Sequence, residues 1–316
     1  MAMPLVETKN LKKYFKTGAG MLHAVEDVNL KIMPGKTLGV VGESDCGKST
    51  LGRTILRLQP ATAGEVLYNG ENILKYKGKD MQKIHLNMQM VFQDPYSSLD
   101  PRMSVHNLIA EPVQVCGLLK TKAEINEHVR EIMDMCGLPA DQANLFPHEL
   151  DGGLRQRVGL ARAMAVSPKF IVCDEPVSAL DVSIQAQILN LLMDLQEQRE
   201  LSYMFITHDL CVVKHISDEI MVMYMGQVVE HAKTAELFAN PVHPYTKALL
   251  HAVPTIDLSK RNREGFMLRG EVTSPINPAP GCRFAPRCPY ATDKCKENVC
   301  LKEVSPDHFV ACSLCD

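Results

Sequence analysis

The stretch "GESDCGKST", residues 42–50, fits the pattern G-x-x-x-x-G-K-[ST] of a phosphate-binding loop. An apolar run, "TLGVV" (37–41), precedes it, and the stretch "KSTLGRTILRL" (48–58) after it has helical spacing. The apolar face predicted for that helix consists of Leu51, Ile55 and Leu58. Strand, glycine-rich loop and helix form the context that a phosphate site requires. A plain glycine-rich turn is the alternative.

Each part of this loop has a chemical task. Backbone N–H groups of residues 43–49 would form a nest around the β- and γ-phosphates of a nucleotide. Lys48 would neutralise the phosphates, Ser49 would offer its hydroxyl to Mg²⁺, and the helix dipole would add to the attraction. The predicted nucleotide-binding residues are Gly42, Glu43, Ser44, Asp45, Cys46, Gly47, Lys48, Ser49 and Thr50.

Strand and helix patterns alternate along the rest of the chain. Predicted strands and hairpins occupy 64–73, 89–94, 169–176, 202–209 and 219–232; predicted helices occupy 105–117, 123–136, 153–166, 183–198 and "NPVHPYTKALL" (240–250). The helix over 183–198 should face inward with Ile184, Ile188, Leu191, Leu192 and Leu195. Such alternation predicts an α/β core with a parallel sheet, into which the helical block is inserted.

Polar side chains follow three of the predicted strands. "KFIVCDEP" ends in Asp174 and Glu175, at the sheet edge where open α/β folds bind ligands. Asp174 would hold Mg²⁺ through water, and Glu175 would act as general base on the attacking water. Gln93 would contact the metal and the water, and His208 would reach the γ-phosphate. The alternatives are an ordinary pair of acids at a strand end and a structural histidine.

The composition excludes several classes of protein. Over 316 residues the net charge is −3, without the clustered basic excess of a nucleic-acid surface. No apolar run approaches the roughly 18 residues that span a bilayer. The start, "MAMPLVETKNLKK", lacks the pattern of a signal peptide. We therefore expect a cytosolic protein, which would work at a membrane by docking to a partner that spans it.

Cysteines gather at the C-terminal end, where six of the 11 fall within the last 35 residues. In a reducing cytosol, such a cluster favours a metal or an iron–sulfur centre over disulfides. Cys282, Cys288, Cys295 and Cys312 are the four candidate ligands of a [4Fe–4S] cluster, and Cys300 and Cys315 are left over. Zinc stays open because Cys312 and Cys315 form one tight pair.

Taken together, these motifs resemble the ATP-binding cassette of ABC transporters. The resemblance covers about residues 4–255 and runs, in the family's order, through the phosphate-binding loop, Gln93, the signature region "LDGGLRQR" (150–157), "IVCDE", the "SALD" loop (178–181) and His208. "VFQDPYSSLDPRM" and "HPYTKALL" look like the dipeptide/oligopeptide importers, and "SPINPAPGCRFAPRC" is similar to the second, F-type, ATPase subunit of those importers.

The resemblance implies a P-loop NTPase with a RecA-like parallel sheet, an antiparallel β subdomain and a helical subdomain at about 96–165. The ATP-binding domain would span 4–255 and a Cys-rich appendage 256–316. Phe15, or Tyr14, would stack on adenine. The signature residues Asp151, Gly152 and Gly153 and the loop residue Asp181 would face the ATP of a second cassette, and the Cys-rich tail would carry an iron–sulfur cluster.

The resemblance also implies partners and a location. Two cassettes, as a heterodimer, would close head to tail on two permease subunits, which Gln93 and the helical insertion would touch. An extracytoplasmic peptide-binding protein would supply the solute. The chain would sit peripherally on the cytoplasmic face of a prokaryotic cell membrane, and nucleic acid would not be a partner.

Three residues depart from the family pattern. The family has Gly at Asp45, Ser at Asp151 and Gln at Leu154. A carboxylate about 6 Å from one phosphate charge costs roughly 2–3 kcal/mol at an effective dielectric near 20. Asp151 can cap a helix as Ser does, but an ionised acid cannot donate a hydrogen bond to a phosphate.

From the sequence we therefore expect an ATPase subunit that powers peptide import, with turnover reduced by Asp45 and Asp151. The alternative is a degenerate ATP-binding scaffold or regulator beside an active paralogue. A soluble cassette for DNA repair or translation is a third hypothesis. The single cassette, the importer-like tail and the lack of a basic surface argue against it.

Overall fold

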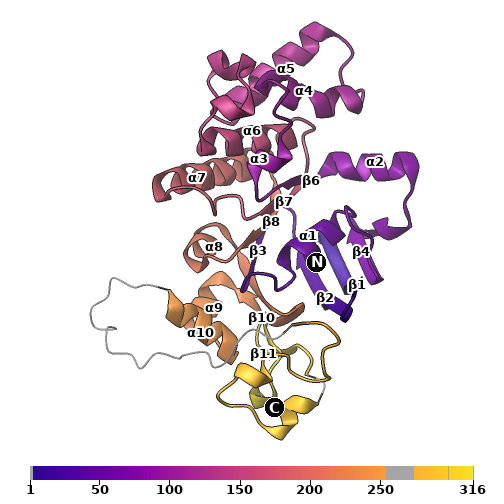
Figure 1. Ribbon diagram of the computed structural model, residues 1–316, viewed down its shortest axis with the longest axis vertical. Helices are drawn as coiled ribbons and strands as arrows, with labels where there is room; N and C mark the ends of the chain where they lie inside the picture. The colour runs from indigo at the N-terminus through magenta and orange to yellow at the C-terminus, as the bar shows by residue number, and fades with distance from the viewer. Residues whose placement is uncertain (1–2, 254–273, 298, 316) are drawn as a thin grey trace. The chain divides into compact units, whose positions relative to one another are not determined.

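The computed structural model describes residues 3–253, 274–297 and 299–315 (Figure 1). The chain divides into two compact units, the first made of Met1–Lys75 and Phe205–Asp316 and the second of Tyr76–Met204. The boundary predicted near residue 255 lies outside the described residues, so the predicted division into 4–255 and 256–316 stays a prediction. In the described part of the chain, no helix is both long and apolar enough to span a bilayer.

An antiparallel sheet of four strands opens the first unit, in the order β2-β1-β4-β5. Its strands are β1 (Val6–Thr17), β2 (Gly20–Ile32), β4 (Ala63–Tyr68) and β5 (Glu71–Asn72). Asn69 and Gly70 both have positive φ, 49° and 79°, as a tight hairpin turn requires. The predicted hairpin over 64–73 is therefore confirmed, whereas β1 and β2 carried no pattern that had singled them out.

A second sheet of the first unit carries the strand before the phosphate-binding loop. In it β3 (Thr37–Val41) pairs in parallel with β9 (Glu219–Tyr224), and β9 pairs antiparallel with β10 (Gln227–Lys233) around the turn at Met225 and Gly226. The C-terminal strands β12 (His308–Val310) and β11 (Lys302–Ser305) then continue the order β3-β9-β10-β12-β11. The Cys-rich tail thus extends the sheet that positions the loop.

Helices α1 (Lys48–Ile55), α8 (Leu210–Ile216), α9 (Thr234–Ala239) and α10 (Pro244–Ala252) complete the first unit. Three aromatic rings join three of its parts: Tyr224 of β9, Tyr245 of α10 and Phe284 of the tail. The ring centroids of Tyr224 lie 4.7 Å from Tyr245 and 5.2 Å from Phe284, in edge-to-face geometry. We call these three residues the aromatic triad.

The second unit contains the predicted helical block. Its strands β6 (Met88–Val91) and β7 (Phe170–Asp174) are parallel, with Val91 opposite Cys173. Its helices are α2 (Gly78–Asn87), α3 (Pro95–Ser98), α4 (Val105–Val115), α5 (Lys122–Met135), α6 (Gly152–Met164) and α7 (Val182–Arg199). The three helices predicted between residues 105 and 166 are confirmed. Strand β8 (Ser202–Thr207) contains the division between the units.

Two predicted apolar faces need correction. Helix α1 ends at Ile55, so Leu58 lies beyond it and is 50% exposed. The helix ends because Arg57 adopts a left-handed conformation. The N–H groups of residues 57 and 58 then donate to the carbonyl oxygens of Thr54 and Arg53. On α7, Ile188, Leu192 and Leu195 are buried as predicted, whereas Leu189 replaces the partly exposed Ile184 and Leu191.

Candidate active site

Between β3 and α1, the phosphate-binding loop is shaped by two glycines. Gly42 has φ 155°, and a Cβ there would lie 2.2 Å from the Met223 carbonyl oxygen. Gly47 has φ 101°, and its Cβ would lie 2.0 Å from the Ala24 carbonyl oxygen. A side chain at either position would collide with backbone, which explains why the pattern demands glycine there.

Lys48 lies inside this loop and is only 4% exposed. Its ammonium donates hydrogen bonds to the carbonyl oxygens of Gly42, at 2.9 Å, and Glu43, at 2.8 Å. The Cys46 thiol, 3.7 Å from the ammonium, is buried, and burial raises its pKa above the ordinary value. The loop therefore holds one fixed positive charge at its centre. Ser44 is exposed, and Ser49 and Thr50 are half-buried at the start of α1.

Asp45, the first departure from the family pattern, has φ 59°. Aspartate tolerates this left-handed conformation better than most residues with a Cβ. Its side chain is exposed, and no hydrogen bond or ion pair from its carboxylate is found among the described residues. The loop therefore accommodates the acid sterically.

Glu43 corrects one detail of the predicted nest. Its backbone N–H donates to the Tyr245 hydroxyl at 2.8 Å. This amide is therefore committed to a side chain of α10 and does not point at a phosphate. The Glu43 carboxylate is paired with the Arg287 guanidinium, which comes from the Cys-rich tail.

The two candidates for adenine stacking differ in their surroundings. Tyr14 stacks on the His23 ring at 4.0 Å and donates its hydroxyl to Glu26 at 2.6 Å. Burial and this hydrogen bond raise the pKa of Tyr14 to about 12. Phe15 is half-buried, with the Lys13 ammonium 4.6 Å from its ring centroid. Nothing in these contacts tests which ring binds adenine.

In the second unit, the predicted water-activating residues lie together. Strands β6 and β7 are parallel, so their carboxyl ends meet at one edge of the sheet. Asp174, the last residue of β7, is fully buried, and Glu175 leaves the strand with φ 47°. The Gln93 side-chain amide, two residues beyond β6, donates to Glu175 Oε2 at 3.1 Å.

The signature region forms the beginning of α6. Asp151 is the N-cap, and its carboxylate accepts the Leu154 N–H at 2.8 Å, as predicted. A Cβ on Gly153 would lie 2.7 Å from the Ile184 side chain, so this glycine permits close packing against α7. Gly152 lies similarly beside Leu180, 3.2 Å from where its own Cβ would be.

Asp181 begins α7 in the same manner, by accepting N–H groups of Ser183 and Ile184. Hydrogen bonds from Ile184 and Ser183 hold the pKa of Asp181 below its ordinary value, so it is a charged cap at neutral pH. His208 follows β8 and is exposed, and the next residue, Asp209, caps α8. The predicted residues are thus divided: the loop and His208 belong to the first unit, and Gln93, Asp174, Glu175, Asp151 and Asp181 to the second.

In the tail, the first and third cysteines lie side by side. The Cys282 N–H donates to the Cys295 carbonyl at 2.8 Å. Burial raises the pKa of the Cys282 thiol to about 11. It also raises the pKa values of the Cys288 and Cys312 thiols, and repulsion from Cys295 adds to the shift of all three. Within the described ranges, however, no three His, Cys, Asp or Glu side chains are close enough to hold a metal ion.

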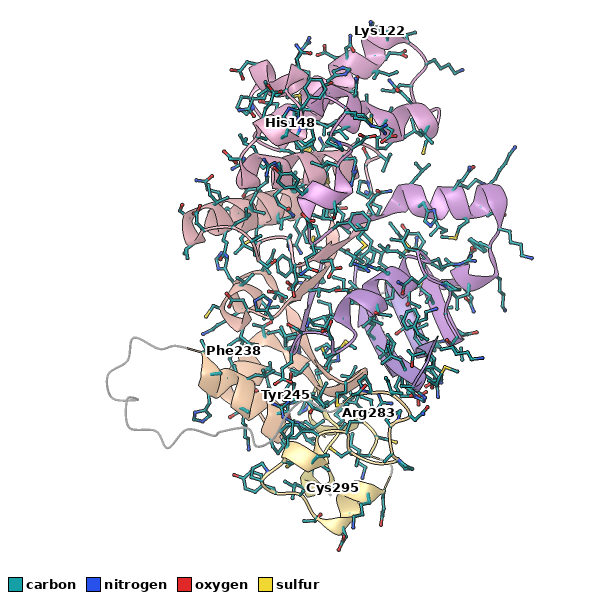
Figure 2. The ribbon with its side chains drawn as sticks, viewed as in Figure 1. Lys122, His148, Phe238, Tyr245, Arg283 and Cys295 are labelled. Atoms are coloured by element: carbon teal, nitrogen blue, oxygen red, sulfur yellow. The ribbon has the colours of Figure 1, made fainter. Side chains whose placement is uncertain are left out.

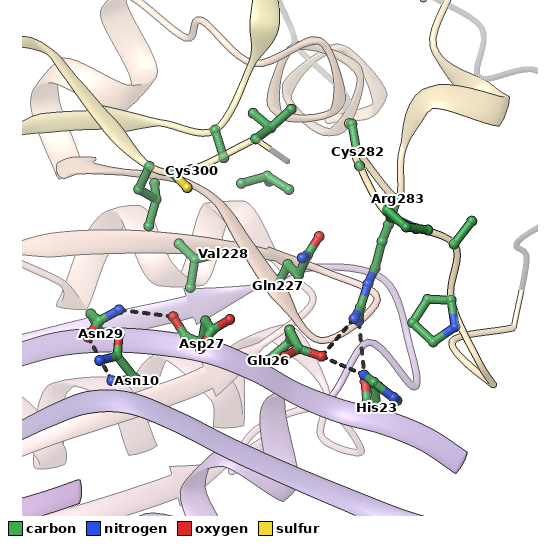
Figure 3. A pocket seen from close by; sticks show the side chains of 18 residues that line it. Asn10, His23, Glu26, Asp27, Asn29, Gln227, Val228, Cys282, Arg283 and Cys300 are labelled. Atoms are coloured by element: carbon green, nitrogen blue, oxygen red, sulfur yellow. Dashed lines mark hydrogen bonds and ion pairs between the residues drawn. The ribbon is translucent and has the colours of Figure 1, made fainter. Parts of the chain in front are cut away.

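Next to this segment, a cavity of about 680 Å³ is lined by β2, β10 and the tail (Figure 3). The Arg283 side chain reaches from the tail to Glu26 of β2 across one side of it, at 3.1 Å. Although burial alone would raise the pKa of Glu26, hydrogen bonds from Tyr14, His23 and Lys12 lower it to about 2. The leftover cysteine Cys300 also lines this cavity.

Comparison with known proteins decides the family. The sequence model described as "ABC transporter" matches residues 25–178, and the one described as "Oligopeptide/dipeptide transporter, C-terminal region" matches 229–295. The chain is 47% identical to the oligopeptide transport ATP-binding protein AppF of Bacillus subtilis over 98% of this chain and 97% of that protein. The chain belongs to the ABC transporter family.

Further relatives agree with this family. The oligopeptide transport ATP-binding protein OppF of Bacillus subtilis is 48% identical over 99% of this chain and 97% of that protein. Among solved structures, the dimeric post-hydrolysis state of the ATP-binding cassette MJ0796, bound to ADP and Pi, has a TM-score of 0.67 at 30% identity. It covers 72% of this chain and 98% of the cassette chain. The predicted cassette fold is confirmed, and ABC cassettes are ATPases that use ATP and Mg²⁺.

Sequence reasoning missed two residues that contact the loop: Tyr245 and Arg287. Tyr245 belongs to the stretch "HPYTKALL", whose likeness to peptide importers was noted, but no pattern indicated its contact. Arg287 lies one residue before Cys288, inside a segment interpreted only through its cysteines.

Proposed function

We propose that this chain is the ATP-hydrolysing subunit that powers import of di- or oligopeptides across a cytoplasmic membrane. The carrying observation is that the chain matches oligopeptide transport ATP-binding proteins over nearly its whole length. The match includes a C-terminal region of the oligopeptide/dipeptide transporter type over residues 229–295. The residues to which we assign hydrolysis, Lys48, Ser49, Asp174, Glu175 and His208, are all present in the chain.

In this proposal, each predicted residue has one role. Lys48 binds the phosphates, and Ser49, Gln93 and Asp174 hold Mg²⁺, which would neutralise phosphate charge. Glu175 takes the proton of the attacking water, and His208 contacts the γ-phosphate. The hydrogen bond from Gln93 to Glu175 supports this assignment because it orients the carboxylate of the proposed base. Phe15, with Tyr14 as its alternative, stacks on adenine.

The proposed assembly contains two cassettes on two membrane-spanning permeases. The dimeric state of the MJ0796 cassette supports a dimer here. Within it, the signature residues Asp151 to Gly153, and Asp181, would face the ATP held by the partner cassette. We propose that the partner is a second, different ATPase subunit, that a peptide-binding protein acts outside the membrane, and that the chain lies on the membrane's cytoplasmic face.

For the tail, we propose that Cys282, Cys288, Cys295 and Cys312 hold a [4Fe–4S] cluster, with Zn²⁺ as the alternative. Four thiols of one segment match the number and type of ligands in either centre, although the described side chains would have to move closer together to bind it. Iron and sulfide assays on anaerobically purified protein, with visible absorption, would show about four irons per chain. One zinc per chain, or no bound metal, would contradict the cluster.

The function is tested in the complete transporter. We would reconstitute it with both ATPases in vesicles and measure peptide-stimulated ATP hydrolysis and peptide uptake. Glu175→Gln in this chain should reduce both by at least about half, since one of the two hydrolytic sites loses its base. The matched control is Glu197→Gln, which removes an exposed acid of α7. Unchanged hydrolysis in Glu175→Gln would favour the degenerate scaffold, for which no comparison gives support.

A further inference from the structure

The Cys-rich tail reaches the phosphate-binding loop through one side chain. The two terminal nitrogens of Arg287 lie 2.8 and 3.1 Å from the two carboxylate oxygens of Glu43. This fork-shaped pair spans 244 positions of sequence and is largely withdrawn from water, because the side chains of Arg287 and Glu43 are 8% and 25% exposed. Hydrogen bonding to Glu43 raises the pKa of Arg287 above its ordinary value, so the guanidinium stays charged.

Glu43 is held at three points. Its carboxylate is bound by Arg287, its N–H by the Tyr245 hydroxyl, and its carbonyl oxygen by the Lys48 ammonium. The position of its carbonyl therefore helps to set the position of the ammonium. Through these bonds, Arg287 is linked to Lys48 by way of a single residue.

The aromatic triad makes this linkage rigid. Phe284, three residues before Arg287, packs edge-to-face on Tyr224, and Tyr224 packs in the same way on Tyr245 (Figure 2). The Tyr224 hydroxyl also lies 3.4 Å from Arg287. The tail, α10 and β9 thus share one packed core, from which both the arginine and the tyrosine reach Glu43.

Stability alone is a poor explanation for this pair. Arg287 Nε is buried and has no hydrogen-bond partner within the described part of the chain. An unsatisfied buried donor costs about 1–3 kcal/mol. Buried ion pairs are often no more stabilising than apolar residues of similar size. The place of this arginine is better explained by what it positions.

We propose that Arg287 is a positioning residue for the phosphate-binding loop. It acts through the Glu43 carboxylate to keep the Glu43 carbonyl on the Lys48 ammonium, so that the Cys-rich tail sets the affinity of the loop for nucleotide phosphates. The inference deepens the proposed function, because it rests on the loop binding ATP.

A double-mutant cycle on the full-length chain tests this proposal. A fluorescent ATP analogue with Mg²⁺ is titrated into wild type, Arg287→Gln, Glu43→Gln and the double variant. Each single change should weaken binding about tenfold, within the range of measured coupling between residues in contact. The double variant should be no weaker than either single one, because both act on the same link.

The control variant is Asp307→Asn. Asp307 also joins the tail to the sheet, at 2.7 Å from Lys233, but both side chains are mostly exposed and neither touches the loop. Its affinity should equal that of wild type. Circular dichroism and thermal unfolding identify variants that fail to fold. Arg287→Lys, which keeps the charge but loses the two-pronged hydrogen bonding, should show an affinity between those of wild type and Arg287→Gln.

Two outcomes would overturn the inference. One is an affinity of folded Arg287→Gln within twofold of wild type, and the other is a double variant whose loss equals the product of the single losses. In both cases wild type still binds, so the proposed function stands and only the positioning role fails. If wild type itself does not bind the analogue, the proposed function fails as well.

Discussion

Asp45 and Asp151 both stand where the family pattern has a small, uncharged residue, yet their surroundings differ. Asp45 has φ 59°, is exposed, and forms no ion pair or hydrogen bond through its side chain among the described residues. Asp151 has an extended backbone and caps α6 through the Leu154 N–H. One carboxylate is part of the local structure, and the other only adds a charge.

This difference predicts where each acid acts. A left-handed residue with a Cβ costs up to about 1–2 kcal/mol relative to glycine, although Asp pays less than most residues, and no side-chain hydrogen bond or ion pair of Asp45 with the described residues offsets that cost. Its charge also lies in a loop built for an anion. Asp151 accepts a helix N–H and so stabilises the start of α6. The harm it does should therefore be limited to the hydrogen bond that it cannot donate to a phosphate.

The largest expected effect is on Asp45. Asp45→Gly and Asp45→Asn should each strengthen Mg²⁺–ATP binding about tenfold, because the charge is removed in both variants. The gain should fall short of the value for a buried charge, since the exposed carboxylate is screened by solvent. Titration with a fluorescent ATP analogue measures it.

The asparagine variant separates charge from conformation, because Asn also tolerates left-handed backbone. If charge dominates, the Asn and Gly variants should gain equally, and the gain should shrink when salt is raised from 0.05 to about 0.5 M. A gain seen only with glycine would mean that backbone strain, and not charge, is what Asp45 imposes. No gain in either variant would break the comparison, since Asp45 would then be as harmless as a surface acid.

The same contrast shows what sequence could predict. The glycines at positions 42 and 47, the cap at Asp151 and the meeting of Gln93 with Glu175 all follow from local pattern or from strand ends sharing one edge. Each depends on backbone geometry within a few residues or on a rule of parallel sheets. Such features depend on residues close together in the sequence or on strand order, so a single sequence can predict them.

The contacts of Glu43 with Tyr245 and Arg287 could not be predicted in this way, because they join residues 202 and 244 positions apart. No periodicity marks such a pair, and the only pattern in the segment that contains Arg287 is its cysteines. The end of α1 was missed for a different reason. Arg57 adopts the left-handed conformation that usually requires glycine, so no glycine marks the end of the helix in the sequence.

A second prediction concerns the cap at Asp151. Asp151→Ala should destabilise the chain by about 1 kcal/mol, the usual loss when an N-cap side chain is removed. Asp151→Asn should cost little, because its amide oxygen can still accept the Leu154 N–H. Urea unfolding followed by circular dichroism measures both. A loss of equal size at Asp45→Asn, which keeps the tolerance for left-handed backbone, would show that the Asp45 carboxylate also stabilises its loop, and the contrast between the two acids would fail.

The smallest expected effect separates capping from donation at the same position. Asp151→Ser keeps an oxygen that accepts the Leu154 N–H, so the free energy of unfolding should stay within about 0.5 kcal/mol of wild type. It adds a hydroxyl proton, which the carboxylate lacks and which, in the proposed dimer, would be donated to a phosphate of the partner cassette's ATP. Turnover of the assembled transporter should therefore rise about threefold, while the affinity of the isolated chain for ATP should not change. Asp45→Gly is predicted to do the reverse, raising affinity in the isolated chain. If Asp151→Ser instead raised affinity without a partner present, Asp151 would act on the chain's own nucleotide, and the two acids would belong to one site and not to two.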